Sequence, residues 1–433
     1  MITARTFAGK TYGIYGLARS GRSTAASLIA SGATVLAWDD GEAARAAYDG
    51  PLTDLHAADL SKLDALVVSP GVPHEAPLFQ KALAADIPVI GDIELFALAR
   101  PELPAHRVVG ITGTNGKSTT TALIHHILET AGVPTRMGGN IGLPILSQAP
   151  LPAGGVYVLE LSSFQIDLTY SLDCDVAVLL NITPDHLDRH GNFAAYAAAK
   201  GRLFEMQSPS HHAVFASDDH PSAEISRNAP GIHVWFDAED FGDQRKWPNL
   251  QGPHNIQNAV AASAAARALG IAPADIERGF QTYAGLPHRM ERVAEVDGVL
   301  YVNDSKATNP TSTAPALAAY PHIHWIAGGL AKTDELDACL PHLGHVRVAY
   351  LIGAAAPLFG RLLDGKVPVV QAGTLERAIA LAAAAAGPGD TVMLSPACAS
   401  YDQFKDYEAR GAAFRAVVEA LKSEPLRDGA GGE

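Results

Sequence analysis

A run of glycines and hydroxyl-bearing residues around one lysine is the part of this sequence best suited to chemistry. Residues 112–119 read Thr-Gly-Thr-Asn-Gly-Lys-Ser-Thr, with the spacing G-x-x-G-K-S. Between a strand and a helix, such a loop points backbone N–H groups and a helix N-terminus at an anion. Lys117 adds a charge for the β and γ phosphates of a nucleotide, and Ser118 a hydroxyl for Mg²⁺. A tight turn with an exposed lysine is the alternative. We expect the phosphates to meet Gly113, Thr114, Asn115, Gly116, Lys117, Ser118 and Thr119.

Three further polar positions follow apolar stretches of the same region. Glu160 comes directly after the apolar residues 156–159, and Asp185 and His186 lie in a polar turn after another such run. A carboxylate at a strand end can hold a metal with Ser118, or it can lie at a helix N-terminus. Mg²⁺ prefers oxygen ligands, so residue type alone leaves the role of His186 open. Lys200, which follows Tyr196 and three alanines, reads as a solvated helical lysine.

The N-terminal loop Gly16-Leu17-Ala18-Arg19-Ser20-Gly21 is a second candidate for ligand binding. It is close to the dinucleotide fingerprint, but Ala18 stands where that fingerprint has its second glycine. Taken alone, the loop would suggest NAD binding, with Asp39 as the acid on the ribose. This weak match leaves a nicotinamide-dependent dehydrogenase as an alternative function.

Short apolar runs alternate with helical stretches along the whole chain, which is typical of parallel α/β sheets. We predict an α/β fold of three consecutive domains: a Rossmann-like domain at 1–95, a central P-loop ATPase-type parallel sheet at 96–285, and a Rossmann-like domain at 286–433. Gly285–His288 is the expected linker, and Gly387-Pro388-Gly389 should end a helix over 375–386. The predicted strands are 12–15, 33–38, 65–68, 108–112, 156–159, 176–180, 299–302, 323–327, 346–351 and 391–394.

Composition excludes several classes of protein. The 433 residues carry a formal net charge of −14, which disfavours a general nucleic-acid binder. The three cysteines lie far apart, so neither a disulfide scaffold nor a zinc ribbon is expected. No run approaches the ~18 to 20 apolar residues of a membrane span, and the N-terminus has no signal-peptide pattern. We expect a cytoplasmic monomer without a nucleic-acid or membrane partner.

Four further segments carry a resemblance to a known family. They read Leu-Glu-Leu-Ser-Ser-Phe-Gln at 159–165, Asn-Ile-Thr-Pro-Asp-His-Leu-Asp-Arg at 181–189, Asn-Asp-Ser-Lys-Ala-Thr at 303–308 and Ser-Pro-Ala-Cys-Ala-Ser-Tyr-Asp-Gln-Phe at 395–404. Together with Gly-Thr-Asn-Gly-Lys-Ser in the phosphate loop, they make the chain similar to the Mur ligase family, over Gly16 to Arg410. The last segment resembles the members that add glutamate.

The resemblance implies an ATP-dependent ligase of peptidoglycan synthesis. ATP would phosphorylate the carboxylate of UDP-N-acetylmuramoyl-L-alanine, and the amine of D-glutamate would attack the acyl phosphate to form an amide. Both glutamate enantiomers present the same groups, so the residues alone do not choose between them. Other ligases of the superfamily, which add alanine or a diamino acid or act on folate, are alternatives, as is a non-catalytic nucleotide switch.

The resemblance also implies roles for single residues. Lys117, His186 and Lys200 would be catalytic, and two Mg²⁺ ions would be held by Ser118, Glu160, His186 and Lys200, the last carbamylated by CO₂. Asn255, Asn258, Arg289 and Asp304 would contact ATP. The UDP-substrate would meet Arg19, Ser20, Ser69, Gly71, Asn140 and His186. Glutamate would meet Lys306, Thr308, Lys332, Ser400, Tyr401 and Tyr407, although the family often has phenylalanine in place of Tyr407.

Overall fold

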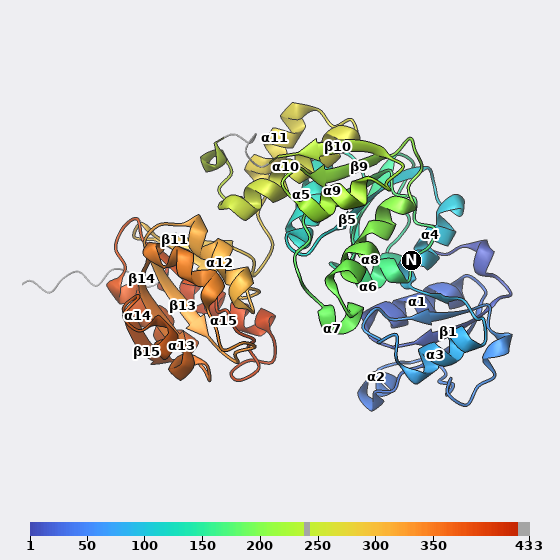
Figure 1. Ribbon diagram of the computed structural model, residues 1–433, viewed down its shortest axis with the longest axis horizontal. Helices are drawn as coiled ribbons and strands as arrows, with labels where there is room; N and C mark the ends of the chain where they lie inside the picture. Colours follow the sequence, from blue (N-terminus) through green and yellow to red (C-terminus); the bar gives the residue numbers. More distant parts are fainter. Residues whose placement is uncertain (238–242, 423–433) are drawn as a thin grey trace, which may run out of the picture. The chain divides into compact units, whose positions relative to one another are not determined.

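The computed structural model describes residues 1–237 and 243–422 (Figure 1). The chain builds three β-sheets in sequence order, which confirms the predicted α/β class. Its contacts group into two compact units. The first holds the described residues up to 237 together with 257–280, and the second holds 243–256 and 281–422. Each unit is described by itself below.

The first sheet contains four parallel strands in the order β2-β1-β3-β4. β1 and β3 lie in the middle and are almost wholly buried, as the continuous apolar runs Tyr-Gly-Ile-Tyr and Ala-Leu-Val-Val predict. The loops after these two strands therefore meet at one edge of the sheet. The strands are β1 (Thr11–Tyr15), β2 (Thr34–Trp38), β3 (Ala65–Val68) and β4 (Val89–Ile90), and the helices are α1 (Arg19–Ala30), α2 (Glu42–Ala46), α3 (Pro77–Ala84) and α4 (Asp92–Ala99).

The second sheet contains six parallel strands in the order β10-β9-β8-β5-β7-β6. β5 is flanked by β7 and β8, so the loops after these three strands share one edge. The strands are β5 (His106–Thr112), β6 (Thr135–Gly139), β7 (Gly155–Glu160), β8 (Val176–Leu179), β9 (His212–Ala216) and β10 (Ile232–Phe236). The helices are α5 (Lys117–Thr130), α6 (Ser163–Asp167), α7 (Leu187–His190), α8 (Phe193–Glu205), α9 (His220–Ser226), α10 (Pro253–Ala268) and α11 (Pro273–Thr282).

The third sheet has the order β11-β12-β16-β13-β14-β15, with β11 antiparallel to β12 and the other neighbours parallel. Separate hydrophobic clusters cover its two faces, one centred on Trp325 and the other on Phe414. The strands are β11 (Glu291–Val296), β12 (Val299–Asn303), β13 (Ile323–Gly328), β14 (Val346–Ile352), β15 (Val369–Gly373) and β16 (Thr391–Leu394). The helices are α12 (Pro310–Ala319), α13 (Ala356–Leu363), α14 (Leu375–Ala385) and α15 (Tyr407–Leu421).

All ten predicted strands are present, each with ends within two residues of the prediction, and α14 ends before Gly387 as expected. The predicted domain division at residue 95 falls inside α4, and that at 285 falls between α11 and β11. These boundaries stay predictions. Over the ranges that the structure describes, no helix is both long and apolar enough to cross a membrane.

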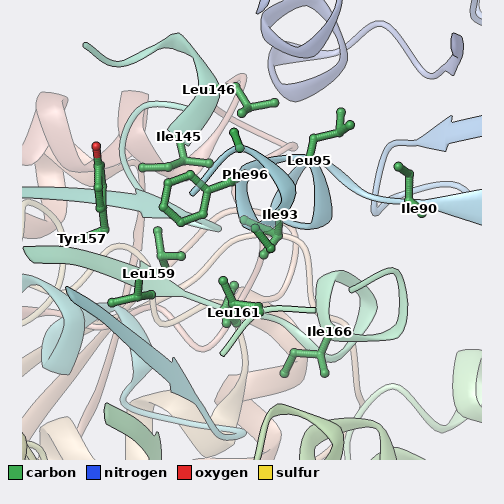
Figure 2. Close-up of a cluster of buried hydrophobic side chains, with 14 of the residues drawn as sticks. Ile90, Ile93, Leu95, Phe96, Ile145, Leu146, Tyr157, Leu159, Leu161 and Ile166 are labelled. Carbon is green, nitrogen blue, oxygen red and sulfur yellow. The ribbon is translucent and has the colours of Figure 1, made fainter. Parts of the chain in front are cut away.

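A single hydrophobic cluster joins the first sheet to the second (Figure 2). α4 supplies Ile93, Leu95 and Phe96, and the ring of Phe96 meets that of Tyr157 edge-on at 5.0 Å between centroids. Glu94 of the same helix is buried and accepts hydrogen bonds from the backbone N–H groups of residues 170 and 171 at 2.7 and 2.9 Å. The loops of the first two sheets are consequently placed on one common core.

We expect Phe96→Ala to lower the free energy of unfolding by about 3 to 5 kcal/mol, because the ring is fully buried and its removal leaves a cavity. Leu98→Ala is the matched control, since this side chain of the same helix is 41% exposed and should change stability by about 0.5 kcal/mol or less. Urea unfolding of both variants measures the difference. Equal losses in the two variants would contradict a shared core centred on α4.

Candidate functional site

The phosphate loop lies between β5 and α5, as predicted, and two of its glycines have backbone angles that other residues rarely adopt. Gly113 has φ of 147° and Gly116 φ of 86°. A Cβ on Gly116 would lie 2.2 Å from the side-chain oxygen of Asn258, so this glycine also brings α10 close to the loop. The backbone N–H groups of Thr114 and Asn115 donate to the backbone and side-chain oxygens of Asn181, both at 2.9 Å. The segment after β8 therefore fixes the loop.

Two lysines converge on one carbonyl of this loop. The Nζ atom of Lys117 lies 2.8 Å from the Gly113 oxygen, and that of Lys200 lies 2.9 Å from the same oxygen. Lys200 is 1% exposed, so the interpretation of it as a solvated lysine was wrong: α8 turns this side chain onto the sheet, against the ring of Tyr196. Burial, and secondly the charge of Lys117, hold the pKa of Lys200 well below its ordinary value, against the opposing effect of nearby carboxylates. A neutral, nucleophilic amine is thereby favoured.

Glu160 ends β7, and its carboxylate is 2% exposed. One carboxylate oxygen accepts a hydrogen bond from the Asn140 side chain at 2.8 Å, whereas the other is buried without a hydrogen-bond partner in the described chain. Such an oxygen suits a cation, and the buried Ser118 hydroxyl lies in the first turn of α5. Among the described residues, no three His, Cys, Asp or Glu side chains are grouped to hold a metal. A metal at Glu160 would thus take other ligands from hydroxyls, phosphates or a modified lysine.

His186 begins α7 with a left-handed backbone, at φ of 51°, and its side chain is half exposed. Its ring faces Phe164 edge-on at 5.0 Å between centroids, and its Nε2 lies 3.5 Å from the Asp185 carboxylate. A histidine in an unfavourable backbone conformation with an accessible ring is unlike a core histidine. The structure thus favours a functional role for His186.

The N-terminal loop packs tightly against the turn after β3. Ser69 donates to the backbone oxygen of Gly16 at 3.0 Å, and a Cβ on Gly21 would lie 1.8 Å from that oxygen. Ser20 and Ser69 line a small cavity with the buried Asp92. Gly71 is exposed in the same turn. The predicted UDP-binding residues of this domain therefore lie together at one sheet edge, and Arg19 reaches across to the backbone oxygen of residue 142 at 2.9 Å.

Asp39 has a structural task that weighs against the dehydrogenase alternative. One of its carboxylate oxygens accepts from the backbone N–H of Leu17 at 2.6 Å, and the other from that of Gly41 at 2.8 Å. The carboxylate that would bind a ribose is therefore engaged in holding the loop itself.

The loops of the third sheet hold the residues predicted for glutamate. Nζ of Lys332 lies 3.2 Å from the Thr308 hydroxyl, and Nζ of Lys306 lies 3.7 Å from the ring centre of Tyr407. In the segment after β16, Ser400 is buried and Tyr401 is 71% exposed. Lysines and hydroxyls from three loops are thus gathered on this domain.

Residues predicted for ATP occupy both units. Asp304 is buried, which raises its pKa to about 7, and it accepts from the Met290 backbone at 3.1 Å and from Ser395 at 2.8 Å. Asn255 and Asn258 lie inside α10, which begins at Pro253, so neither is the cap of that helix. Arg289 follows the linker, three residues after Leu286, with which it forms an isolated β-bridge.

Sequence reasoning missed two arginines that bind backbone oxygens. Arg410 is fully buried on α15 and donates to the oxygens of Ser305, Cys398 and Ala399, at 2.9 to 3.4 Å, so it holds together two loops that carry residues predicted for glutamate. Arg189 lies in the segment 181–189 but was given no role, although it contacts the turn after β3. A signal for Arg410 is its place three residues after Tyr407, on the same face of α15.

Because the pKa of Lys200 is lower in the folded chain, the unfolded chain binds more protons between that lowered pKa and 10.5. We therefore expect the stability of the wild type, relative to Lys200→Met, to rise with pH through this window. Urea unfolding at several pH values in CO₂-depleted buffer measures the difference. A difference that does not change with pH would show that the amine keeps an ordinary pKa.

Comparison with known proteins identifies the family of this chain. The model of the Mur ligase middle domain matches residues 111–247, and that of the Mur ligase glutamate ligase domain matches 288–398. A protein of Novosphingobium aromaticivorans named UDP-N-acetylmuramoylalanine--D-glutamate ligase is 58% identical, with 99% of each chain covered. Proteins of the same name from Sphingopyxis alaskensis and Zymomonas mobilis are 58% and 56% identical, each over 97% of this chain and 100% of the relative.

Solved structures show the same fold at lower identity. UDP-N-acetylmuramate-alanine ligase from Thermotoga maritima has a TM-score of 0.61 and 15% identity, with 96% of this chain and 99% of that chain covered. A MurF structure from Acinetobacter baumannii has a TM-score of 0.61 and 18% identity, with 96% and 91% covered. From the domain matches and from relatives of this identity over nearly its whole length, the chain belongs to the Mur ligase family, beside the UDP-N-acetylmuramoylalanine--D-glutamate ligases of that family.

Proposed function

We propose that this chain joins D-glutamate to UDP-N-acetylmuramoyl-L-alanine with cleavage of ATP to ADP and phosphate, in peptidoglycan synthesis. The observation that carries the proposal is the 58% identity, over 99% of both chains, to a ligase of that name. The Lys117 side chain at the phosphate loop supports it, because transfer of a phosphoryl group needs positive charge beside the transferring phosphate.

The reaction would proceed in two transfers. A carboxylate oxygen of the UDP-linked alanine attacks the γ-phosphorus of ATP, the bond to the β-phosphate oxygen breaks, and ADP leaves. The amine of glutamate then attacks the acyl carbon, loses a proton, and expels phosphate as the amide forms. The backbone N–H groups at the start of α5 and the ammonium of Lys117 would stabilise the charge on the transferring phosphate. His186, accessible and next to Asp185, would bind near the reacting carboxylate.

The phosphate end of the site would hold Mg²⁺. Ser118, the partnerless oxygen of Glu160 and the ring of His186 would supply ligands for two ions. When bound, the metal neutralises charge on the phosphates and so assists their attack by an anion. Asn140 would orient Glu160 through the observed hydrogen bond, in addition to the predicted contact with the UDP-substrate.

Lys200 would join this set as a carbamate. Its neutral amine would add to the carbon of CO₂ and lose one proton, which converts a cation into an anionic, carboxylate-like group. The support is local: the amine is buried, its pKa is lowered, and Glu160 is close enough to influence that pKa. A carbamate there would also remove the repulsion between Lys200 and Lys117.

The remaining predicted residues would bind the substrates. Lys332, Thr308, Lys306 and Ser400 suit the carboxylates of glutamate, and the exposed ring of Tyr401 and the Lys306-bound ring of Tyr407 would border it. We propose that the protein is cytoplasmic, because the reaction consumes ATP. We also propose that it is a monomer, and sedimentation tests this oligomeric state. For the UDP-linked substrate we propose Arg19, Ser20, Ser69, Gly71, Asn140 and His186; for ATP, residues 113–119 with Asn255, Asn258, Arg289 and Asp304.

We expect phosphate release from ATP only when Mg²⁺, UDP-N-acetylmuramoyl-L-alanine and D-glutamate are all present, with a product of the matching mass. Lys117→Met should lower that rate by about 100-fold or more, because it removes charge from the transferring phosphate. The control replaces D-glutamate by L-glutamate. Release with the L-enantiomer would overturn the stereochemistry, and release without any amino acid would point to an ATPase or a switch.

We expect ¹³C-labelled bicarbonate to give one carbamate resonance in ¹³C NMR spectra of the wild type, and none in spectra of Lys200→Met. Burial should protect the carbamate from exchange, while surface lysines stay protonated and unreactive. Lys10→Met, which changes an exposed lysine, is the control and should keep the resonance. A wild-type spectrum without this resonance would contradict the carbamate.

A further inference from the structure

The side chain of Arg189 connects the short helix that follows His186 to the turn after β3 of the first sheet. Its Nη2 donates to the backbone oxygen of Val72 at 2.5 Å and lies 3.4 Å from that of Pro70. Ser69 and Gly71, which we propose for UDP binding, belong to the same turn. The guanidinium of Arg189, which belongs to the region of the second sheet, thus binds the backbone of a turn of the first sheet.

The same guanidinium also lies over an aromatic ring beside His186. The Arg189 guanidinium carbon is 4.6 Å from the ring centre of Phe164. The same ring meets His186 edge-on at 5.0 Å and stacks on His190 at 5.4 Å, with an interplanar angle of 14°. His190 is in turn 3.0 Å from the Ser163 hydroxyl. The ring of Phe164 therefore contacts both the guanidinium of Arg189 and the ring of His186.

The local backbone cannot hold His186 by itself. α7 spans Leu187–His190, and its first residue follows a left-handed His186. A helix of one turn is unstable without tertiary contacts, because it forms too few internal hydrogen bonds. The Arg189 guanidinium is partly buried, which lowers its pKa, and its Nε is buried without a hydrogen-bond partner in the described chain. This desolvation opposes folding, and the contacts of Arg189 with the turn after β3 and with the ring of Phe164 offset it.

We propose that Arg189 is a positioning residue that couples the UDP-binding turn at 69–72 to His186, through the ring of Phe164. Binding of the UDP moiety tightens the turn, the turn fixes the guanidinium, and the guanidinium fixes the ring against which His186 rests. The coupling deepens the proposed function and rests on it, since it makes the position of a reactive histidine depend on the first substrate.

The test compares Arg189→Lys with Arg202→Lys in the full-length chain. Arg202 is a matched control, because its guanidinium also lies over a ring, that of Tyr170, and donates to two backbone oxygens, but within the central domain. Lysine keeps the charge but neither the planar stacking nor the forked donors. For Arg189→Lys we expect KM for the UDP-substrate to rise and kcat to fall, each by about 10-fold or more, with KM for ATP within about twofold. Arg202→Lys should change all three by about twofold or less.

A second measurement does not depend on catalysis. Uridine 5′-diphosphate added to the protein should shift the His186 NMR resonance, assigned with His186→Gln, in the wild type and in Arg202→Lys. In Arg189→Lys, at saturating uridine 5′-diphosphate, the shift should be lost. If the wild type has no ligase activity but still shows this shift, the proposed function is wrong and the coupling stands. Unchanged kinetics or an unchanged shift in Arg189→Lys would overturn the coupling itself.

Discussion

The meeting of two lysine side chains at the Gly113 carbonyl is the constraint on which the active region depends. Two ammonium groups within hydrogen-bond distance of one oxygen would repel each other, and burial removes the water that would screen them, so a charged Lys200 is disfavoured. Burial and the charge of Lys117 lower the pKa of Lys200, whereas the nearby carboxylates of Glu160 and Asp185 oppose this shift. The glycine conformations and the two hydrogen bonds that Thr114 and Asn115 donate to Asn181 then serve to keep that carbonyl in place. Positive charge is concentrated here although the whole chain is acidic.

Backbone strain is found at the same loops, but it does not identify them alone. His186 and Ala397 have left-handed backbones in segments that carry the family motifs, and His288 and Met290 have them at the linker. Asp86, Asp297 and His322 have similar angles in turns without proposed roles. A left-handed residue becomes informative when a second observation accompanies it. For His186 that observation is an accessible ring resting on Phe164, which Arg189 holds from its other side.

Prediction from sequence succeeded where burial produces a continuous pattern. Central parallel strands such as β3 and β16 are buried on both faces, so they read as unbroken apolar runs. β6 reads Thr-Arg-Met-Gly-Gly and β10 lies at an edge with exposed residues, so neither has that pattern and both were missed. β4, β11 and β15 were missed as well, and so was β9, although residues 213–216 form a buried apolar run. Lys200 resembled a surface lysine because alanines surround it, and only the packing of α8 decides which face is buried. Arg189 and Arg410 were missed because their partners are backbone oxygens, which every residue possesses.

One carboxylate oxygen of Glu160 is buried without a hydrogen-bond partner among the described residues, which points to a part of the site that the chain alone does not fill. Buried polar atoms are nearly always paired, so an unpaired one costs stability unless a ligand completes it. Thr112 and Thr121 also have unpaired buried oxygens, but a neutral hydroxyl loses less on burial than a charged carboxylate does. Asp92 has an unpaired buried carboxylate oxygen as well, and burial raises its pKa to about 6. A carboxylate oxygen at a strand end, with its twin oriented by Asn140 and a lysine of lowered pKa nearby, is a costly arrangement for stability alone. Its chemistry calls for a cation, and a carbamate formed on Lys200 would bring a second anionic group to the same ion.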